Sequence, residues 1–451
     1  MGLIEMLAND PILKTFWSPW EEVFCEQVSP KAFLNWIPLL IQCGLLYPYF
    51  DRFSSIRWLR LAIMPVNVYC GLRFSVGYCY KPLSRRATLN LMHGCSGIVN
   101  SMKTLEWGLA RNSHEAKLWR RPEFPRTDPN AVVSKESDEP NIQERAPFKL
   151  RDWLLWTTEL WTSPRGFQYG WGARASPNTR SAAMVLKRMY KVNVAHVLTT
   201  TFALLCREHG SATKALHHLG IPSFIGLTLL AEGIYTLAFG FYLVSITDLI
   251  YSYHTLLAHL IHYLNSFFHF PSFVLEFFDL KLYIPWYNYP HSPTSLTQLW
   301  GKAWHQNFRR CFLFCGGLPA GKIAKFVGFS STAERLAILW GSFFISGIMH
   351  EFAIHFIARK PHPNPHILFH EFPGSFIYFF VQPIGILIEP YVIPFIPGGG
   401  LVWTYLFTLL SATPFRTQYL LGYRFLDASY PEVSFKWFLT SLLIPGFTSR
   451  G

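Results

Sequence analysis

The chain has 451 residues, of which 50% are hydrophobic, 17% are aromatic and only 15% are charged. Soluble domains carry roughly 25% charged residues, so this composition excludes an ordinary water-soluble globular domain. The net charge of +13 does not indicate a nucleic-acid-binding protein, because no recognition motif accompanies it. Membrane proteins gather Lys and Arg in their cytoplasmic loops. The composition therefore predicts an all-α polytopic membrane protein.

The N-terminal part, residues 1–110, is predicted to hold membrane segments behind an irregular or amphipathic lead-in. We expect spans at residues 33–50 and 58–80. Residues 84–110 mix apolar and polar positions, which predicts an interfacial or re-entrant helix. The eight cysteines of the chain are scattered and form no CxxC pair, so we expect them to be reduced and buried.

A polar stretch follows at residues 111–191, and its basic residues place it on the cytosolic side of the membrane. Its middle has the Pro, Glu and Ser content typical of a disordered loop. The tryptophan-rich segment "LRDWLLWTTELWTSPRGFQYGWG" comes after this loop. An aromatic belt at the membrane interface is the first interpretation, and contact with a flat hydrophobic substrate is the alternative.

Residues 192–451 are predicted to form the membrane core. Its expected spans are residues 192–206, 222–248, 252–270, 335–357, 374–397 and 401–414, with a shorter one near 436–447. The whole chain then has roughly seven to nine transmembrane helices around an intramembrane reaction cavity. Residues 311–329 are apolar but rich in glycine, which predicts a broken helix.

The segment "SFFISGIMHEFAIH", residues 342–355, places His350 and Glu351 in an apolar run. An ionisable residue inside a membrane is a functional-site hypothesis by default, and a neutral imidazole is suited to take a proton from an alcohol. A helix–helix hydrogen bond is the structural alternative. His350 and His355 lie about 140° apart around a helix, so they do not form the H-E-x-x-H zinc motif. We therefore expect no metal.

The segment "SLTQLWGKAWHQNFRR", residues 295–310, is the second polar cluster. Its aromatic and basic residues are also typical of an interfacial helix. Polar His and amide side chains next to a tryptophan can hydrogen-bond a carbonyl, and arginines pair with phosphates through forked donors. This segment is therefore a candidate site for a substrate that carries both groups.

Together, "LWGKAWHQNFRR" and the later "SGIMHE" resemble the paired signature of the wax-synthase-like branch of the membrane-bound O-acyltransferases. The segments "WTSPRGFQYGW" and "WYNYPHSP" are also similar to that branch. The likeness is greatest to fungal members that acetylate hydroxyls of terpenoid natural products. Lys302 and Ala303 depart from it, because relatives often carry arginines at these positions.

The resemblance implies an enzyme of the endoplasmic reticulum that needs no bound cofactor. Its cosubstrate would be acyl-CoA, most simply acetyl-CoA, and its acceptor a hydroxyl of a lipophilic, terpenoid-type alcohol from the lipid bilayer. His350 matches the general base of the family, His305 matches its upstream polar position, and Asn307 lies in the same motif. The residues expected to bind acyl-CoA or the acceptor are Trp304, Arg309, Arg310 and Glu351.

The chemistry of the residues agrees with this interpretation. Acyl transfer from a thioester to an alcohol needs a base at the hydroxyl, donors for the oxyanion and a site without water. The chain has no G-x-S-x-G nucleophile elbow, which argues against a hydrolase triad. Two alternatives remain, a long-chain wax-ester or sterol-ester synthase and a proton-coupled membrane transporter.

Overall fold

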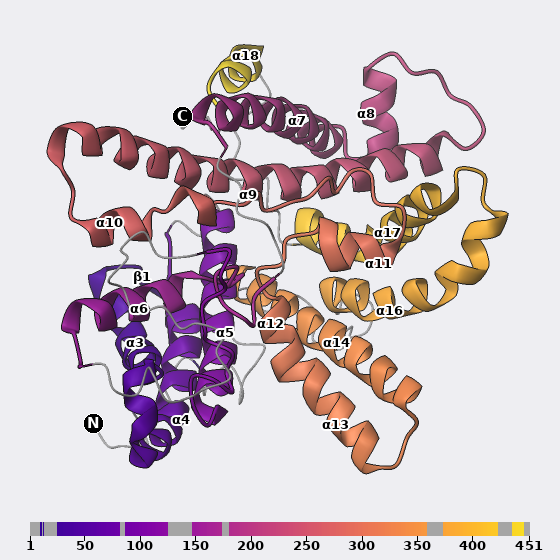
Figure 1. Ribbon diagram of the computed structural model, residues 1–451. Helices are drawn as coiled ribbons and strands as arrows, with labels where there is room; N and C mark the ends of the chain where they lie inside the picture. Colours follow the sequence, from indigo (N-terminus) through magenta and orange to yellow (C-terminus); the bar gives the residue numbers. More distant parts are fainter. Residues whose placement is uncertain are drawn as a thin grey trace. The chain divides into compact units, whose positions relative to one another are not determined.

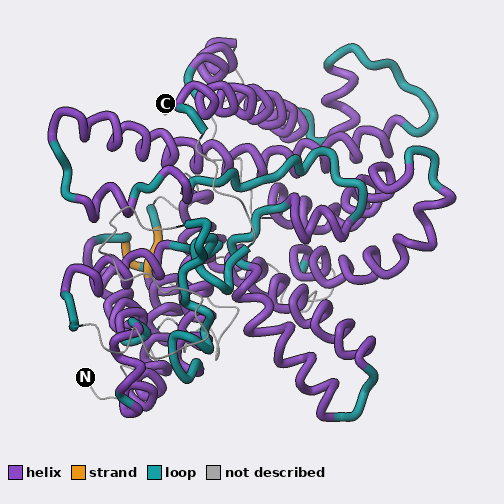
Figure 2. Tube along the Cα trace, in the orientation of Figure 1, coloured by secondary structure: helices purple, strands orange, loops and turns teal. Residues whose placement is uncertain are grey.

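A computed structural model describes residues 10, 12, 25–81, 86–124, 147–173, 180–358, 373–422 and 435–445. In this part of the chain the regular structure is helical apart from one short pair of parallel strands (Figure 2), which confirms the predicted all-α class. The chain divides into two compact units, each built from segments that are distant in sequence. Unit 1 comprises Met1–Pro177, Phe270–Phe277 and Gln306–Phe372, and unit 2 comprises Asn178–His269, Phe278–His305 and Pro373–Gly451.

Three helices of the described residues are long and apolar enough to cross a membrane. They are α9 (Leu227–Phe268), α14 (Ser331–Ala358) and α16 (Gly374–Val392). The predicted total of seven to nine crossings, and the three-part division of the chain by composition, stay predictions.

Unit 1 is a bundle in which α5 occupies a central position. Its described helices are η1 (Pro30–Trp36), α3 (Ile37–Gly44), η2 (Pro48–Arg52), α4 (Ser54–Gly77), α5 (Ala87–Leu109), α6 (Leu150–Thr162), α10 (Ser272–Phe277), α12 (Arg309–Phe312), η7 (Leu313–Gly317), α13 (Leu318–Phe326) and α14. Helix α5 packs against both α4 and α14. The interfacial or re-entrant segment predicted at residues 84–110 is therefore an uninterrupted helix in the interior of this unit.

The predicted span at residues 33–50 is wrong as a single helix. The α-helical part, α3, has eight residues and ends before the 3₁₀ helix η2, which begins at Pro48. Eight residues extend about 12 Å, which is less than half the hydrocarbon thickness of a bilayer. Proline fixes the backbone and offers no N–H for a continuing helix, so the chain turns at this point.

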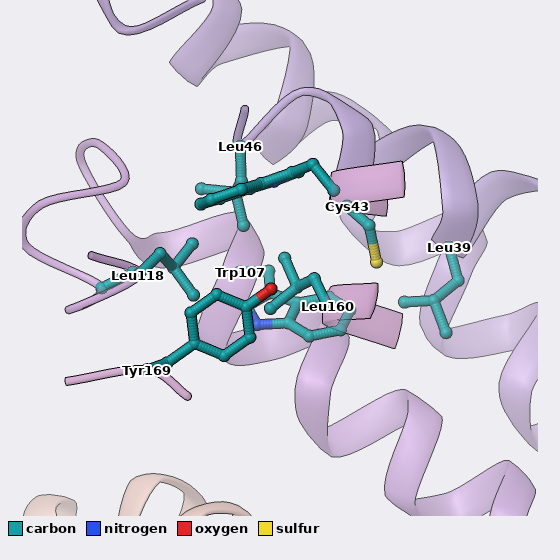
Figure 3. Packing of buried hydrophobic residues seen from close by; sticks show 9 residues of the cluster. Leu39, Cys43, Leu46, Trp107, Leu118, Leu160 and Tyr169 are labelled. Carbon is teal, nitrogen blue, oxygen red and sulfur yellow. The ribbon is translucent and has the colours of Figure 1, made fainter. Parts of the chain in front are cut away.

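The tryptophan-rich segment forms part of the core of unit 1. Trp156 is 6% exposed and Leu160 is fully buried, and both pack with Leu39, Cys43, Leu46, Trp107 and Tyr169 (Figure 3). The indole N–H of Trp153 donates to the Gly44 carbonyl at 3.0 Å. A Cβ at Gly44 would lie 2.6 Å from that indole ring, so only glycine allows this approach. The structure thus gives these tryptophans a packing role that neither sequence interpretation anticipated.

Two cysteines are joined in unit 1, which corrects the expectation that all eight are reduced. A disulfide links Cys25 to Cys79, next to the parallel pair of β1 (Glu26–Gln27) and β2 (Tyr78–Cys79). The two cysteines are 54 residues apart in sequence, so no local spacing could reveal the pair. Cys25 precedes η1, and Cys79 follows the end of α4.

The glycine-rich segment predicted to be broken is a continuous helical path with a π turn at η7. Gly316 packs against α14 so closely that a Cβ there would lie 2.1 Å from the Gly341 carbonyl oxygen. Small residues let two membrane helices approach in this way. Helices α13 and α14 then run side by side (Figure 1).

Unit 2 is also helical. Its described helices are α7 (Ala182–Glu208), α8 (Ala212–His218), α9, η5 (Leu280–Leu282), α11 (Leu296–Gln298), η6 (Leu299–Ala303), α16, η8 (Ile393–Phe395), α17 (Gly399–Thr417), η9 (Gln418–Gly422) and α18 (Phe435–Leu443). Helices α7 and α9 lie along each other (Figure 1). Arg188 of α7 donates to the buried carboxylate of Asp248 at 2.8 Å, which joins the two helices.

Helix α9 merges two predicted spans. Residues 222–248 and 252–270 were expected to cross separately, but α9 continues from Leu227 to Phe268. Its length is about 63 Å at 1.5 Å per residue, roughly twice a bilayer core. No proline lies within it, so nothing in the backbone stops the helix where the polarity rises.

Candidate active site

The first half of the 295–310 motif belongs to unit 2 and is held by a buried carboxylate. Glu389 of α16 is 6% exposed and accepts from the backbone N–H of Leu296 at 2.7 Å. It also accepts from the Thr297 hydroxyl at 2.7 Å. The Ser295 hydroxyl accepts from the N–H of Gln298 at 2.9 Å, as an N-cap does. The free N–H groups at the start of α11 are thereby satisfied.

The motif continues after α11 with a π turn, η6. In η6 the N–H of Trp304 donates to the Leu299 carbonyl at 2.8 Å, five residues back. Such π turns are frequent at functional sites. The Trp300 indole N–H donates to the fully buried amide of Gln382 at 3.1 Å, and that amide donates in turn to Ser411 at 3.1 Å. The turn is therefore anchored to α16 and α17.

His305 lies among aromatic rings. The ring centroids of Trp286, Tyr287 and Trp304 are 6.2, 5.8 and 5.5 Å from that of the imidazole. The "WYNYPHSP" segment is joined to the motif, because the N–H of Asn288 donates to the Ala303 carbonyl at 3.0 Å. His305 and Trp304 thus occupy the aromatic environment that the two segments build together.

Tyr287 is the most buried member of this group, at 2% exposure. Its hydroxyl shares a hydrogen bond of 2.8 Å with Thr247. Burial raises the pKa of the Tyr287 phenol well above its usual range. The phenol is therefore neutral at physiological pH and can serve as a hydrogen-bonding group but not as a base.

The second half of the motif belongs to unit 1, since the boundary between the units falls between His305 and Gln306. Cys311 is 3% exposed and packs with Met349 of α14 and with Ile98, Val99 and Met102 of α5. Phe308 packs against the same cluster. The two sequence motifs therefore meet in the core of unit 1, where their neighbouring residues share one apolar cluster that α5 completes.

Asn307 is the polar residue inside this packed segment. It is 4% exposed, and no donor among the described residues lies within hydrogen-bond distance of its Oδ1. Buried amides in folded proteins are nearly always hydrogen-bonded, and an unmatched one costs about 1–3 kcal/mol. Because Oδ1 is an acceptor, it is a candidate contact for a donor group of a substrate, such as a hydroxyl.

The two arginines of the motif differ. Arg309 is exposed, whereas Arg310 pairs with Glu106 of α5, with its Nε 2.5 Å from the carboxylate. Glu106 is 5% exposed, and Lys103, one turn earlier, is 7% exposed and donates to the Trp161 carbonyl at 3.2 Å. Glu106 and Lys103 were not among the residues predicted from the sequence. Their spacing could have indicated them, because two ionisable residues three apart on a largely apolar helix need partners.

His350 is oriented by its own helix. Its Nδ1 lies 2.7 Å from the carbonyl oxygen of Ser346, so Nδ1 carries the proton and donates. In the neutral imidazole the basic nitrogen is then Nε2. Glu351 is partly buried and follows on α14. The side chain of His355 lies outside the part of the chain that the structure describes.

Among the described residues, no group of three or more His, Cys, Asp or Glu side chains is placed to hold a metal ion. Unit 1 supplies a partly buried imidazole with a defined tautomer and a buried amide, and unit 2 supplies a second imidazole among aromatic rings. These groups suit proton transfer and carbonyl polarisation.

Comparison with known proteins points to the same chemistry. Residues 283–373 match the profile of the membrane bound O-acyl transferase family. This region contains both motifs. The chain is also similar to an acetyltransferase of Arthrobotrys oligospora, with 29% identity over 108 residues, which is 22% of this chain and 22% of that relative. No solved structure matches the chain.

These matches confirm the resemblance to membrane-bound O-acyltransferases, and to fungal acetyltransferases among them, that the two motifs predict. The matched relative shares less than a quarter of its length with this chain. The likeness is therefore concentrated in one part of the chain.

Proposed function

We propose that the protein is a membrane-bound O-acyltransferase that transfers the acyl group of acyl-CoA to a hydroxyl of a lipophilic alcohol. The match of residues 283–373 supports the reaction class, and the acetyltransferase relative favours acetyl-CoA as the donor. The acceptor we favour is a terpenoid-type secondary metabolite. The observation that carries the proposal is the tautomer of His350, because its Nδ1–H donates to Ser346 and leaves Nε2 as the base.

In this mechanism His350 accepts the proton of the acceptor hydroxyl as its oxygen attacks the thioester carbonyl. A C–O bond forms, the carbonyl π electrons move onto oxygen, and the tetrahedral intermediate collapses with loss of the CoA thiolate. The proton held by His350 then passes to the thiolate, which leaves as CoA. A base in position contributes roughly 10²–10⁴-fold. An aliphatic thiolate is a good leaving group, so these steps need no nucleophilic residue.

The developing oxyanion needs hydrogen-bond donors. We assign this role to the Nδ2–H group of Asn307, a buried amide in the same unit as His350, or to an N–H of His305, two residues earlier in the chain. One oxyanion donor is worth about 10²–10³-fold in rate. Trp304 and Glu351 are proposed to contact the substrates. Arg309 is exposed and is the better candidate for the CoA phosphates, since Glu106 already engages Arg310.

We also propose that the protein is a multi-pass protein of the endoplasmic reticulum with the bilayer as its source of acceptor. The three long apolar helices support membrane insertion. The polar region at 111–191 is proposed to face the cytosol, where acyl-CoA is available.

The test is acyl transfer in isolated membranes that contain the chain, with labelled acetyl-CoA and a panel of terpenoid alcohols. Palmitoyl-CoA with a long-chain alcohol is assayed in parallel. The variant is His350→Ala, and the matched control is His254→Ala, because His254 also places its Nδ1 2.8 Å from the carbonyl four residues back, on an exposed face.

We expect acetyl transfer that falls at least about 10²-fold in His350→Ala and persists in His254→Ala. Label that moves only from palmitoyl-CoA would identify a wax-ester or sterol-ester synthase. Absence of transfer to every acceptor, with intact protein in the membrane, would reject the enzyme and favour the proton-coupled transporter.

A further inference from the structure

A basic cleft lies in unit 1 at the N-terminal end of α4, away from the two motifs in sequence. Its volume is about 230 Å³. The charged side chains that line it are Arg57, Arg60, Arg111 and Asp51, which is a net charge of +2 from three guanidinium groups and one carboxylate. Asp51 accepts from the backbone N–H of Ser113 at 3.0 Å. The cleft is therefore positively charged.

Arg60 has unused hydrogen-bonding capacity in this cleft. It is 1% exposed, and its Nη2 donates to the carbonyls of Ala110 and Arg111 at 2.6 and 3.0 Å. Its Nε is buried without an acceptor among the described residues, and so is the Nε of Arg57. Two buried N–H donors without acceptors each leave a desolvation cost. An anion in the cleft would satisfy both.

The backbone adds further donors. Helix α4 begins at Ser54, which lines the cleft, and no side chain caps its first turn. The first N–H groups of a helix have no partner within the helix, and its N-terminus carries partial positive charge that favours a phosphate. Guanidinium groups and a helix N-terminus here converge on one volume.

We propose that this cleft binds the phosphate group of an anionic phospholipid. The apolar rim supports a lipid, because Trp58 is 68% exposed and Phe53 is 45% exposed beside the arginines. Tryptophan beside basic residues is the composition of the membrane interface. The volume is below the about 300–1,000 Å³ of pockets that enclose a drug-sized ligand, so the cleft holds a headgroup rather than a whole nucleotide.

The other end of α4 supports the choice of leaflet. The Cys25–Cys79 disulfide lies just past Gly77, and disulfides persist in oxidising compartments such as the lumen of the endoplasmic reticulum. The 24 residues of α4 extend about 36 Å, so the disulfide and the cleft lie at opposite ends of one long helix. The cleft is assigned to the cytoplasmic side, where anionic lipids concentrate and basic pockets bind their headgroups.

The test measures thermal stability of the purified full-length chain in neutral detergent, with phosphatidic acid, CoA or inorganic phosphate added in separate arms. The variants are Arg57→Gln and Arg111→Gln. Arg60 is left unchanged because its side chain also donates to the carbonyls of Ala110 and Arg111, which follow the end of α5. The matched control is Arg52→Gln, an exposed arginine that stacks on Tyr49, 3.5 Å from the ring centroid, and does not line the cleft.

We expect phosphatidic acid to raise the melting temperature of the unchanged protein and of Arg52→Gln. In each of the other two variants the concentration required should rise about tenfold, as for the loss of one charge-assisted hydrogen bond. Melting temperatures without ligand show whether each variant is folded.

Stabilisation by CoA or inorganic phosphate but not by phosphatidic acid would retain the phosphate site and overturn the lipid as its ligand. An equal lipid response in all four proteins, measured by co-purified radiolabelled phosphatidic acid as well as by melting, would overturn the site itself. Neither measurement depends on acyl transfer, so the proposed function stands or fails separately.

Discussion

The two halves of the motif at residues 295–310 are held by different interactions. In unit 2 the half that contains Trp304 and His305 is fixed through neutral or backbone donors, with Glu389 accepting from N–H and hydroxyl groups. In unit 1 the half that contains Asn307 is fixed by a charge pair, Arg310 with Glu106. A buried carboxylate can thus cap a helix or neutralise a cation, and its removal has different consequences in the two cases.

The largest effect on stability is expected from Arg310→Gln. It leaves Glu106 buried without its cation, and breaking a buried pair costs about 3–5 kcal/mol. The measurement is thermal unfolding of the purified protein in detergent. The matched control is Arg309→Gln, an exposed neighbour that should change the free energy of unfolding by less than about 0.5 kcal/mol.

A double variant tests whether the two residues stabilise the protein as a pair. Glu106→Gln combined with Arg310→Gln removes both charges, so much of the lost stability should return. If the double variant is as unstable as the sum of the two single changes, the pair does not act as a unit and the comparison between the two halves fails.

Asn307→Ala is expected to separate catalysis from stability. If Asn307 is the oxyanion donor, acyl transfer should fall about 10²–10³-fold. The melting temperature should stay the same or rise, because the change removes an unmatched polar atom from the core. The assay is the acetyl-transfer measurement above, beside thermal unfolding of the same preparation. A drop in activity that only tracks a drop in folded protein would contradict the assignment.

Glu389→Gln should weaken the other half less. The amide of glutamine keeps one acceptor oxygen but lacks the charge of the carboxylate, which accepts from the Leu296 N–H and the Thr297 hydroxyl. Hydrogen bonds to charged groups are worth about 1.5–3 kcal/mol. We expect a loss of about 2 kcal/mol by thermal unfolding. A loss equal to that of Arg310→Gln would show that the cap and the charge pair are energetically alike.

The smallest effect is expected from Trp300→Phe. It removes the N–H that Gln382 accepts, and we expect a loss of about 1 kcal/mol. Trp403 is the matched control, because it packs in the same cluster and its indole N–H has no acceptor in the described part of the chain. Trp403→Phe should be neutral or stabilising in the same unfolding assay, and an equal loss in both would assign the effect to packing.

Several features of the molecule were predictable from local sequence. The long apolar runs at α9, α14 and α16 predicted membrane helices, since length and hydropathy act within a segment. The two motifs predicted the family resemblance, and the profile match to residues 283–373 confirms it. His350 was singled out because an ionisable residue inside a membrane is a functional-site hypothesis by default.

Other features depended on contacts between distant segments. The partner of Arg310 lies more than 200 residues earlier in α5, and Cys25 pairs with a cysteine 54 residues away. The tryptophans of α6 pack on α3. Such pairings depend on which helix faces come into contact. Hydropathy predicts that a residue is buried but does not identify the residue it contacts.

The sequence by itself determined that this chain is helical, has helices long and apolar enough to cross a membrane and carries the paired polar motifs of an acyltransferase-like protein, because these properties reside in composition and short spacing. Only the tertiary structure decided which arginine is already paired and where the basic cleft lies. Each of these depends on the positions of atoms from separate segments, and packing of the folded chain alone brings them within hydrogen-bond distance.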